Sequence, residues 1–378
     1  MKITIIGGGT SSVILSVLAK RKGHDVSILT RNPKKWNNQL FIYNDDLDWC
    51  ENSVITEHID VITDNKEVLR DSDIIIICGV PVQFYKDVFE NIRDFVPSKH
   101  FYIGSICAYG GFNWLVEHYL HEKKYTIFGF QLIPFMCNTI EYGNKCKMFG
   151  AKRLLRFATQ GENSKIIEST MQDIVGIQLS STDFLTCTLW QNNPSLHPPI
   201  LYALFNNWDG ISYFEPSSLP EYIYGDVTQN VSDVIEALDK EICLIQEYVR
   251  KTHSDVDYYK EFKPIKECIL ENYKDQIMDD KTLMSCIKTN IAFKSHKMQY
   301  ITNNNGLIKP NIHHKFFEDC PFGLCIYKHF AILYNINTPL LDEIIMWNQN
   351  IIGKEYLVDG KLIGKHIHET CCFFINKN

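Results

Sequence analysis

The chain has 378 residues, which at about 150 residues per domain predicts two or three domains. Hydrophobic residues make up 45% and charged residues 22%, an ordinary folded composition that leaves little room for long disordered tails. The formal net charge of −7 argues against a broad phosphate-binding surface, so nucleic acid is not expected as a partner.

The chain begins with a short β-branched segment, residues 2–6, which predicts a strand and is followed at once by three glycines. Apolar residues from Val13 to Leu18 then recur at helical spacing, and the segment 20–23 closes this helix. A second strand is expected at residues 25–30. The chain therefore opens as strand, tight turn, helix, strand.

The alternation of strands and helices continues to residue 130. Residues 74–78 form a continuous apolar run of the kind expected for a central parallel strand covered on both faces. The acidic stretch 44–52 is expected to be a loop or hairpin. The other expected elements are strands at 60–63, 101–106 and 125–130 and helices at 83–95 and 112–120. Strands separated by helix-length segments predict an α/β fold, a doubly wound parallel sheet of the Rossmann type.

After about residue 185 the spacing of the apolar residues becomes helical. Apolar side chains from Val231 to Val249 lie three and four residues apart, which predicts a long helix. Further helices are expected at residues 267–273, 281–290, 322–334 and 340–352. The sequence thus predicts two domains, residues 1–185 and 186–378, of which the second is mostly α-helical.

The glycine turn has the pattern G-x-G-x-x-S, ending at Ser12. Gly7 permits the turn, and Gly9 lets the backbone approach a pyrophosphate. Thr10 and Ser11 then open a helix whose N-terminus offers unpaired N–H groups, and Ser12 is expected where the helix touches the strand. Glycines serve in any tight turn. Because this turn follows a strand and opens a helix, dinucleotide binding is favoured over a merely structural turn.

The segment after the second strand bears on the choice of cofactor. An NAD enzyme usually places an acid here to hold the ribose 2′-hydroxyl. This chain has Thr30, Arg31 and Lys35, which favours the 2′-phosphate of NADP. NAD stays possible because arginine can also stack on adenine, and a solvated basic turn is the simplest alternative. Gly79 and Pro81, directly after the central apolar run, complete the expected cofactor site.

Several longer strings are too particular to follow from periodicity or composition. They are Pro-Ser-Leu-His-Pro-Pro-Ile-Leu at 194–201, Trp-Asp-Gly at 208–210, Glu-Asp-Cys-Pro-Phe-Gly at 318–323, Met-Trp at 346–347 and Ile-Gly-Lys-Glu-Tyr-Leu-Val-Asp-Gly at 352–360. With the glycine turn, in this order and over nearly the whole chain, they resemble the octopine/nopaline dehydrogenase family of opine dehydrogenases.

The resemblance implies an NAD(P)-binding Rossmann domain at 1–185 and a helical substrate domain at 186–378. The family uses NAD(P)H to reduce the imine formed from a 2-oxo acid and the amino group of an amino acid, which gives a secondary amine. His197 matches the catalytic histidine, and Asp319 matches the aspartate that orients it. Hydride addition to C=N needs a proton donor, and histidine can serve near pH 7. Without the resemblance, a histidine before two prolines is more often a helix-entry or core residue.

The resemblance also shows where this chain departs from the family's substrate residues. Many members carry arginine five residues before the aspartate, but here His314 stands there, followed by Lys315, and neither has a bidentate guanidinium fork. Tyr109 and Leu132 stand where polar contacts are expected, and Trp208 completes the expected substrate set. We therefore expect an amine partner that is less anionic or more apolar than the usual family substrates.

Two other functions stay open. One is a reductase of a simple 2-oxo compound, resembling the ketopantoate or glycerol-3-phosphate dehydrogenases, which also pair a Rossmann half with a helical half. The other is a cofactor-binding protein that has a decayed substrate site and a non-enzymatic role. The retained histidine and aspartate oppose the non-enzymatic role. The His-Pro, Trp-Asp-Gly and Glu-Asp-x-Pro strings oppose the simple 2-oxo reductase.

Cysteine usage and hydropathy bear on the compartment. The thirteen cysteines are odd in number and scattered, and no stretch approaches 18 consecutive apolar residues. We therefore expect a cytoplasmic protein that is not bound to a membrane. The histidines and cysteines at 366–372 lack zinc-site spacing, so no metal is expected. The expected partners are small-molecule substrates, a 2-oxo acid and an amino acid or other amine, and the protein is expected to be a monomer or homodimer.

Overall fold

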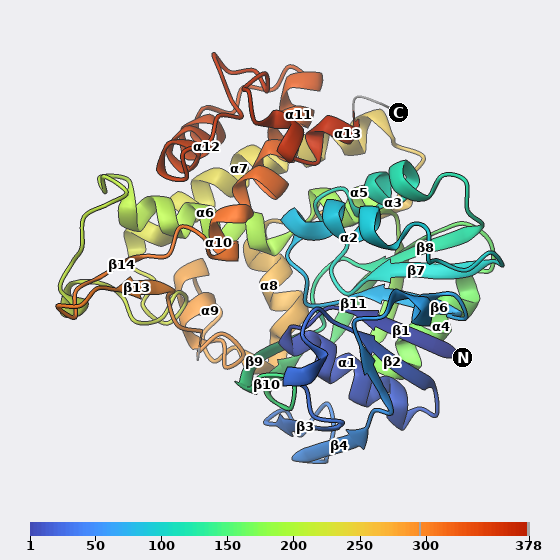
Figure 1. Ribbon diagram of the computed structural model, residues 1–378. Coiled ribbons are helices and arrows are strands. Elements are labelled where there is room, and N and C mark those ends of the chain that lie inside the picture. The colour runs from blue at the N-terminus through green and yellow to red at the C-terminus, as the bar shows by residue number, and fades with distance from the viewer. Residues whose placement is uncertain (295, 376–378) are drawn as a thin grey trace. The chain divides into compact units, whose positions relative to one another are not determined.

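The computed structural model describes residues 1–294 and 296–375, without the side chains of residues 315, 373 and 374. The chain divides into two compact units, Met1–Thr188 and Leu189–Asn378. The N-terminal unit carries the large sheet, and the C-terminal unit is built mainly of helices (Figure 1).

The N-terminal unit is built around an 8-stranded sheet with the order β12-β11-β8-β7-β6-β1-β2-β5. Its strands are β1 (Lys2–Ile6), β2 (Asp25–Leu29), β5 (Val61–Thr63), β6 (Ile74–Ile77), β7 (Phe101–Ser105), β8 (Tyr125–Phe130), β11 (Leu154–Gln160) and β12 (Gln178–Thr182). The chain runs outward from β1 to β5, returns to the centre at β6 and continues to β8 on the other side. This doubly wound order confirms the predicted Rossmann sheet and puts a ligand crevice where β1 and β6 end.

One edge of the sheet differs from the prediction. Strand β11 pairs antiparallel with β8, whereas the neighbouring pairs β7–β8 and β11–β12 are parallel. The sheet is therefore mixed rather than parallel throughout. The connection from β8 to β11, residues 131–153, contains a β-hairpin and no crossover helix that would bring β11 back in the parallel direction.

A second, 4-stranded sheet with the order β4-β3-β10-β9 was not predicted. Its strands are β3 (Gln39–Asn44), β4 (Val54–His58), β9 (Phe135–Glu141) and β10 (Lys145–Ala151). Helix α1 (Thr10–Arg21) contacts both this sheet and strands β1 and β2 of the large one. Every residue from 12 to 19 is consequently buried, which requires a helix that is apolar or small on all sides.

The remaining helices of this region lie along the large sheet. They are α2 (Tyr85–Ile92), α3 (Phe112–Leu120), α4 (Ser164–Val175) and α5 (Phe184–Leu189). Helix α2 is shorter than predicted because residues 82–84 form a 3₁₀ turn. Strand β6 is buried along its whole length, as its continuous apolar run predicts.

The C-terminal unit is mostly helical, as predicted. Its helices are α6 (Asn192–Phe205), α7 (Gln229–Thr252), α8 (Ile265–Tyr273), α9 (Leu283–Thr289), α10 (Lys315–Glu318), α11 (Cys325–Leu333), α12 (Pro339–Ile351) and α13 (Cys372–Ile375), with a hairpin of β13 (Tyr300–Thr302) and β14 (Ile308–Pro310). The predicted apolar stripe of α7 is buried against α6 and α12. Helix α6 was not predicted, because Pro198 and Pro199 lie inside it.

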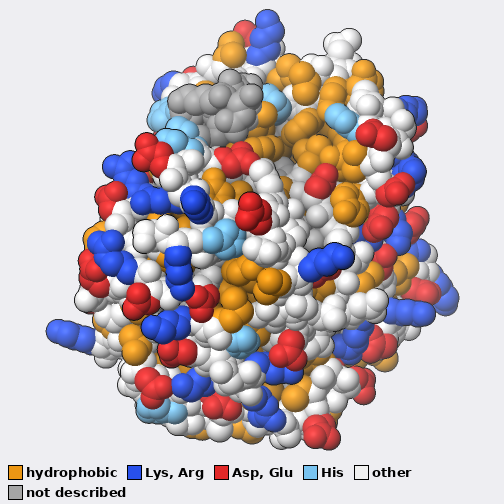
Figure 2. All heavy atoms as spheres, turned by 90° about the vertical axis from the view of Figure 1, so that its right-hand side faces the viewer, with side chains coloured by type: hydrophobic (Ala, Val, Ile, Leu, Met, Phe, Trp, Pro, Cys, Tyr) orange, Lys and Arg blue, Asp and Glu red, His pale blue; other side chains and the backbone are white. Residues whose placement is uncertain are grey.

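Three features of the structure bear on the expected class of protein. Among the described residues, no helix is long and apolar enough to cross a bilayer. Lys and Arg side chains are interspersed with Asp and Glu over the face drawn in Figure 2. All thirteen cysteines are free thiols, most of them buried.

Candidate functional site

The glycine turn lies directly against the end of β6. Gly7 has a φ of +137°, and a Cβ placed on it would come within 1.9 Å of the Cys78 carbonyl oxygen. A Cβ on Gly9 would lie 2.9 Å from the Cα of Gly79, which itself has a φ of +63°. Because backbone meets backbone here, none of these three positions has room for a side chain.

Ser12 connects the start of α1 to the same strand end. Its hydroxyl is fully buried and donates a hydrogen bond of 2.8 Å to the carbonyl of Cys78. A small residue was expected at this contact. A glycine at position 12, as in G-x-G-x-x-G, could not donate this hydrogen bond to the Cys78 carbonyl.

The N-terminus of α1 is suited to an anion. Its N-cap residue Gly9 supplies no side-chain cap, and no acidic residue lies in the first turn. Within the described part of the chain, no acceptor is found for the backbone N–H groups of Gly9, Thr10 and Ser11. The positive end of the helix dipole adds to these donors, so a phosphate group would be favoured at this position.

A cavity of about 670 Å³ opens beside this turn. The predicted cofactor residues that line it are Gly7, Gly9, Thr30, Arg31, Gly79 and Pro81. Thr10, Ser11 and Ser12 form the helix start next to it. Lys35 is exposed on the 3₁₀ turn that follows β2 and does not line the cavity. Lys35 was expected to bind the cofactor, but it lies on a turn outside the residues that line this cavity.

Sequence reasoning missed three charged residues on the same cavity, Asp64, Lys66 and Asp87. Asp64 and Lys66 follow β5, which pairs with β2, so they lie beside the segment that holds Arg31. The guanidinium of Arg31 lies 6.0 Å from the ring centroid of Phe84 across the cavity. The strand order, had it been known, would have indicated Asp64 and Lys66, because neighbouring parallel strands end at the same edge of a sheet.

In the C-terminal unit, His197 and Asp319 form a buried pair. These residues are 4% and 2% exposed, and Nδ1 of the histidine lies 2.6 Å from Oδ2 of the aspartate. Because a carboxylate accepts at this distance, Nδ1 carries the proton that it donates to Asp319. In the neutral ring Nε2 therefore has the lone pair, and in the protonated ring it has the second proton.

Close packing between two family strings brings this pair together. His197 lies within α6, and Asp319 ends α10 just before the π-helical turn Cys320–Leu324. A Cβ on Gly323 would lie 2.3 Å from Cγ of Pro194. Glycine at this position therefore lets the π-helical turn approach α6 closely enough for the pair to form.

Tyr224 occupies the other nitrogen of the imidazole, and sequence reasoning missed it. Its hydroxyl lies 2.7 Å from Nε2 of His197. Burial raises the pKa of Tyr224 above its usual value, with the nearby Tyr273 and Asp319 adding to the effect. The phenol therefore stays protonated and can donate to a neutral imidazole. Nothing in the sequence marks this tyrosine, which lies in a loop without hydrophobic periodicity.

Two aromatic contacts hold the imidazole and place His314. The ring of Phe316 packs on His197 with centroids 4.3 Å apart, and His314 meets Phe316 edge-on at 4.2 Å. Nδ1 of His314 also accepts a hydrogen bond from the Phe316 N–H and caps α10. One ring therefore separates His314 from His197. The side chain of Lys315 lies outside the described residues.

The other expected substrate residues, Trp208, Leu132 and Tyr109, are buried or half-buried. Trp208 is 8% exposed, and its indole N–H donates to the Ser212 carbonyl in the turn that follows α6. Leu132 belongs to the hydrophobic core of the N-terminal unit. Both residues are buried, as His197 and Asp319 are, and their role toward a substrate stays a prediction. Tyr109 is half-buried in the connection between β7 and α3.

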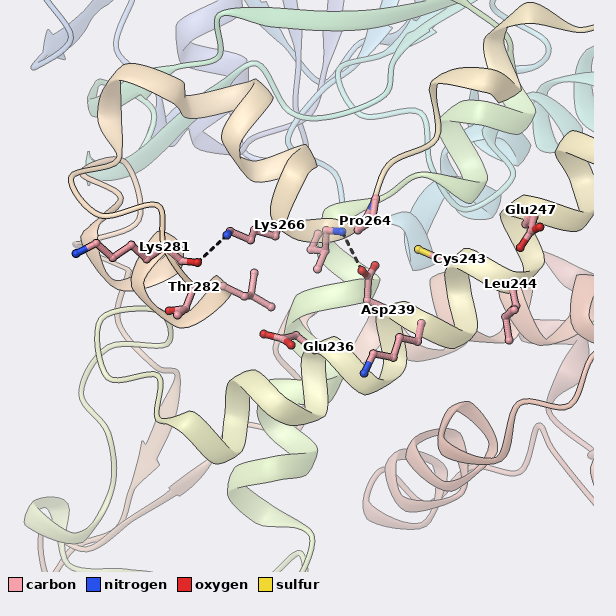
Figure 3. Close-up of a pocket in the computed structure, with 12 residues that line it drawn as sticks. Glu236, Asp239, Cys243, Leu244, Glu247, Pro264, Lys266, Lys281 and Thr282 are labelled. Atoms are coloured by element: carbon pink, nitrogen blue, oxygen red, sulfur yellow. Dashed lines mark hydrogen bonds between the residues drawn. The ribbon is translucent and has the colours of Figure 1, made fainter.

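A second cleft, of about 760 Å³, lies between α7, the start of α8 and the start of α9 (Figure 3). Asp239 accepts a hydrogen bond of 3.0 Å from the Ile265 N–H at the start of α8, and burial raises the pKa of Asp239 to about 6. Burial also raises the pKa of Cys243 to about 12, so its thiol is no nucleophile at neutral pH. Among the described residues, no group of three or more His, Cys, Asp or Glu could hold a metal ion.

Models of known protein families match segments in both units. Residues 180–352 match the alpha-helical domain of NAD/NADP octopine/nopaline dehydrogenases. Residues 2–112 match the N-terminus of NAD-dependent glycerol-3-phosphate dehydrogenases. With the doubly wound sheet and its glycine turn, the second match identifies the N-terminal unit as an NAD(P)-binding Rossmann domain.

Individual proteins match over most of the chain. Octopine dehydrogenase of Pecten maximus is 27% identical over 391 residues, which cover 98% of this chain and 95% of that protein. Tauropine dehydrogenase of Arabella iricolor is 29% identical over 256 residues, 66% of this chain and 63% of that protein. The structure of octopine dehydrogenase with NADH and L-arginine has a TM-score of 0.82 at 26% identity and covers 98% of this chain and 94% of that one. Together these comparisons support an opine dehydrogenase-like family for this chain, which confirms the resemblance of its sequence strings.

Proposed function

We propose that this protein is an NAD(P)H-dependent oxidoreductase of the opine type, which condenses a 2-oxo acid with an amine and reduces the product to a secondary amine. The buried pair of His197 and Asp319, 2.6 Å apart, carries this proposal, since reduction of an imine consumes one proton along with the hydride. Residues 1–185 would hold the cofactor and residues 186–378 the substrates. The match to the octopine/nopaline dehydrogenase helical domain supports the same division.

The residues around the glycine turn fit a dinucleotide. The backbone contact of Gly9 with Gly79 leaves an open approach to the N–H groups at the start of α1, where the pyrophosphate would bind. Arg31 and Lys66 on the same cavity favour the 2′-phosphate of NADP, whereas Asp64 could hold the ribose hydroxyls of NAD. We place NADP first because two cations line this end of the cavity. The bound nicotinamide would supply the hydride.

The proton would come from His197. Asp319 accepts a hydrogen bond from the Nδ1–H of His197 and keeps that proton on Nδ1, so the transferable proton is the one at Nε2. The imine nitrogen takes this proton as the adjacent carbon takes the hydride, which leaves a secondary amine and a neutral histidine. Because the Tyr224 hydroxyl contacts Nε2, substrate either displaces this hydroxyl or receives the proton through it.

The substrate class follows from the residue next to this pair. His314, which lies one ring away from His197, stands where many members of the family carry arginine. An imidazole is charged only at lower pH, so it would bind a carboxylate conditionally. The amine partner is therefore less anionic or more apolar than the usual family substrates.

The test is a panel of 2-oxo acids crossed with amino acids and uncharged amines, read by NADPH oxidation and repeated with NADH. Oxidation that requires both an oxo acid and an amine, and that falls strongly in His197→Ala, supports the proposal. Oxidation with an oxo acid alone indicates a simple 2-oxo reductase. NADPH binding by calorimetry without turnover on any pair indicates a cofactor-binding protein with a decayed substrate site.

A further inference from the structure

The turn between β9 and β10 carries Tyr142 over the glycine turn. A Cβ placed on Gly8 would lie only 2.7 Å from the Tyr142 hydroxyl oxygen. Tyr142 also lines the cofactor cavity. The middle position of G-x-G normally accepts a side chain. Here the phenol occupies that space, which accounts for the glycine at position 8.

The hairpin that presents Tyr142 is fixed to the segments around the glycine turn. The Thr139 hydroxyl lies 2.6 Å from the Thr10 hydroxyl at the start of α1. Gly143, with a φ of +68°, accepts a hydrogen bond of 2.9 Å from the Asn37 N–H. The buried Trp36 packs edge-on against the Tyr142 ring at 6.0 Å. Tyr142 is thus held in position without using its hydroxyl.

The hydroxyl itself has no protein partner. Across residues 1–294 and 296–375, no donor or acceptor forms a hydrogen bond with the Tyr142 hydroxyl. The residue is 43% exposed and lines the cavity, so the cavity is open to it. Close by, the N–H groups of Gly9 and Thr10 also lack acceptors among these residues. Unpaired donors from two separate elements therefore lie at the same glycine turn.

We infer that Tyr142 is a cofactor-binding residue, whose hydroxyl donates a hydrogen bond to the pyrophosphate of the bound dinucleotide from the side opposite the start of α1. The inference rests on the proposed cofactor role of the N-terminal unit. A phenol donates well to a phosphate oxygen, and a hydrogen bond to a charged group is among the stronger ones in proteins. The hairpin would thereby close the pyrophosphate site on its exposed side.

The test compares ligands that contain or lack the pyrophosphate. Calorimetry of the full chain would measure the Kd of ADP-ribose, which contains it, and of adenosine 2′-monophosphate, which does not. Tyr142→Phe is expected to raise the Kd of ADP-ribose about tenfold or more and to leave that of adenosine 2′-monophosphate unchanged. Tyr43→Phe, on β3 of the same small sheet, is the matched control and should change neither Kd.

A double-mutant cycle tests the contact with the glycine turn. Gly8→Ala should weaken ADP-ribose binding strongly in the parent, because the new methyl group meets the Tyr142 hydroxyl. It should weaken binding much less in the Tyr142→Phe background, where that oxygen is absent. Equal ADP-ribose affinity of the parent and Tyr142→Phe, or additive effects in the cycle, overturns the inference while the cofactor role stands. A parent that binds neither ADP-ribose nor NADPH overturns the proposed function as well.

Discussion

Asp239→Asn is expected to stabilise the protein at neutral pH. The carboxyl of Asp239 has its pKa raised from 3.8 to about 6 by burial, reinforced by the nearby Glu236 and Glu267. Well below pH 3.8 the group is protonated in both the folded and the unfolded chain and does not affect stability. As pH rises from 4 to 6, the unfolded chain ionises first, so stability falls. Above pH 6 the folded protein bears the full cost, roughly 3 kcal/mol at 1.36 kcal/mol per pKa unit.

The asparagine keeps an oxygen that can accept the Ile265 N–H at the start of α8 but carries no charge. Urea unfolding followed by tryptophan fluorescence should therefore show a stability gain of about 2–4 kcal/mol at pH 7.5 that shrinks toward zero near pH 4. Asp239→Ala should gain less, because it also removes the helix cap. Asp233→Asn, an exposed carboxylate of the same helix, is the matched control. A gain for Asp239→Asn that is the same at pH 4 and pH 7.5 would refute this reasoning.

Four further predictions concern the proposed function. Gly9→Ala should abolish NADPH binding measured by calorimetry while circular dichroism stays that of the parent, because its methyl group meets the backbone of Gly79; an unchanged Kd contradicts the close contact. Arg31→Asp should narrow or invert a preference for NADPH over NADH, because it weakens the binding free energy of NADPH by about 1.5–3 kcal/mol. Equal affinities of the parent for NADPH and NADH would exclude recognition of the 2′-phosphate by Arg31. Asp319→Asn should lower turnover about 10²–10⁴-fold with NADPH affinity unchanged, and normal turnover would exclude the pair from catalysis. His314→Arg should improve use of anionic amine partners and flatten the pH dependence of their KM; no change in either would show that this side chain does not face the substrate.

The glycine turn, the central strand and the long helix of the second half could be predicted because each leaves a local sequence signal. Glycines after a β-branched strand mark a tight turn before a helix, and the apolar run at 74–77 marks a strand covered on both faces. Similarly, the apolar stripe of α7 has the spacing of a helix buried on one side. Each of these signals is contained in one short, continuous stretch of the sequence.

Other features depend on contacts that no local pattern records. Strand β9 is largely exposed, so it has little hydrophobic alternation, and the small sheet that contains it was missed. The direction of β11 depends on the connection that precedes it rather than on its own residues. Tyr224 meets His197 across 27 positions of sequence in a loop without period. The pairing of His197 with Asp319 was expected only through the family resemblance, because their separation of 122 positions hides it from any local reading.

The most direct test of the central claim follows the hydride into the product. Parent protein would be incubated with NADPH deuterated at both C4 positions, a 2-oxo acid and the amine that gives the highest turnover, and the products would be analysed by mass spectrometry. The account predicts a secondary amine whose mass is that of both substrates joined with loss of water and gain of one deuteride and one proton, with the deuterium on the former carbonyl carbon. Deuterium found only in a 2-hydroxy acid, with the amine unchanged, would contradict it.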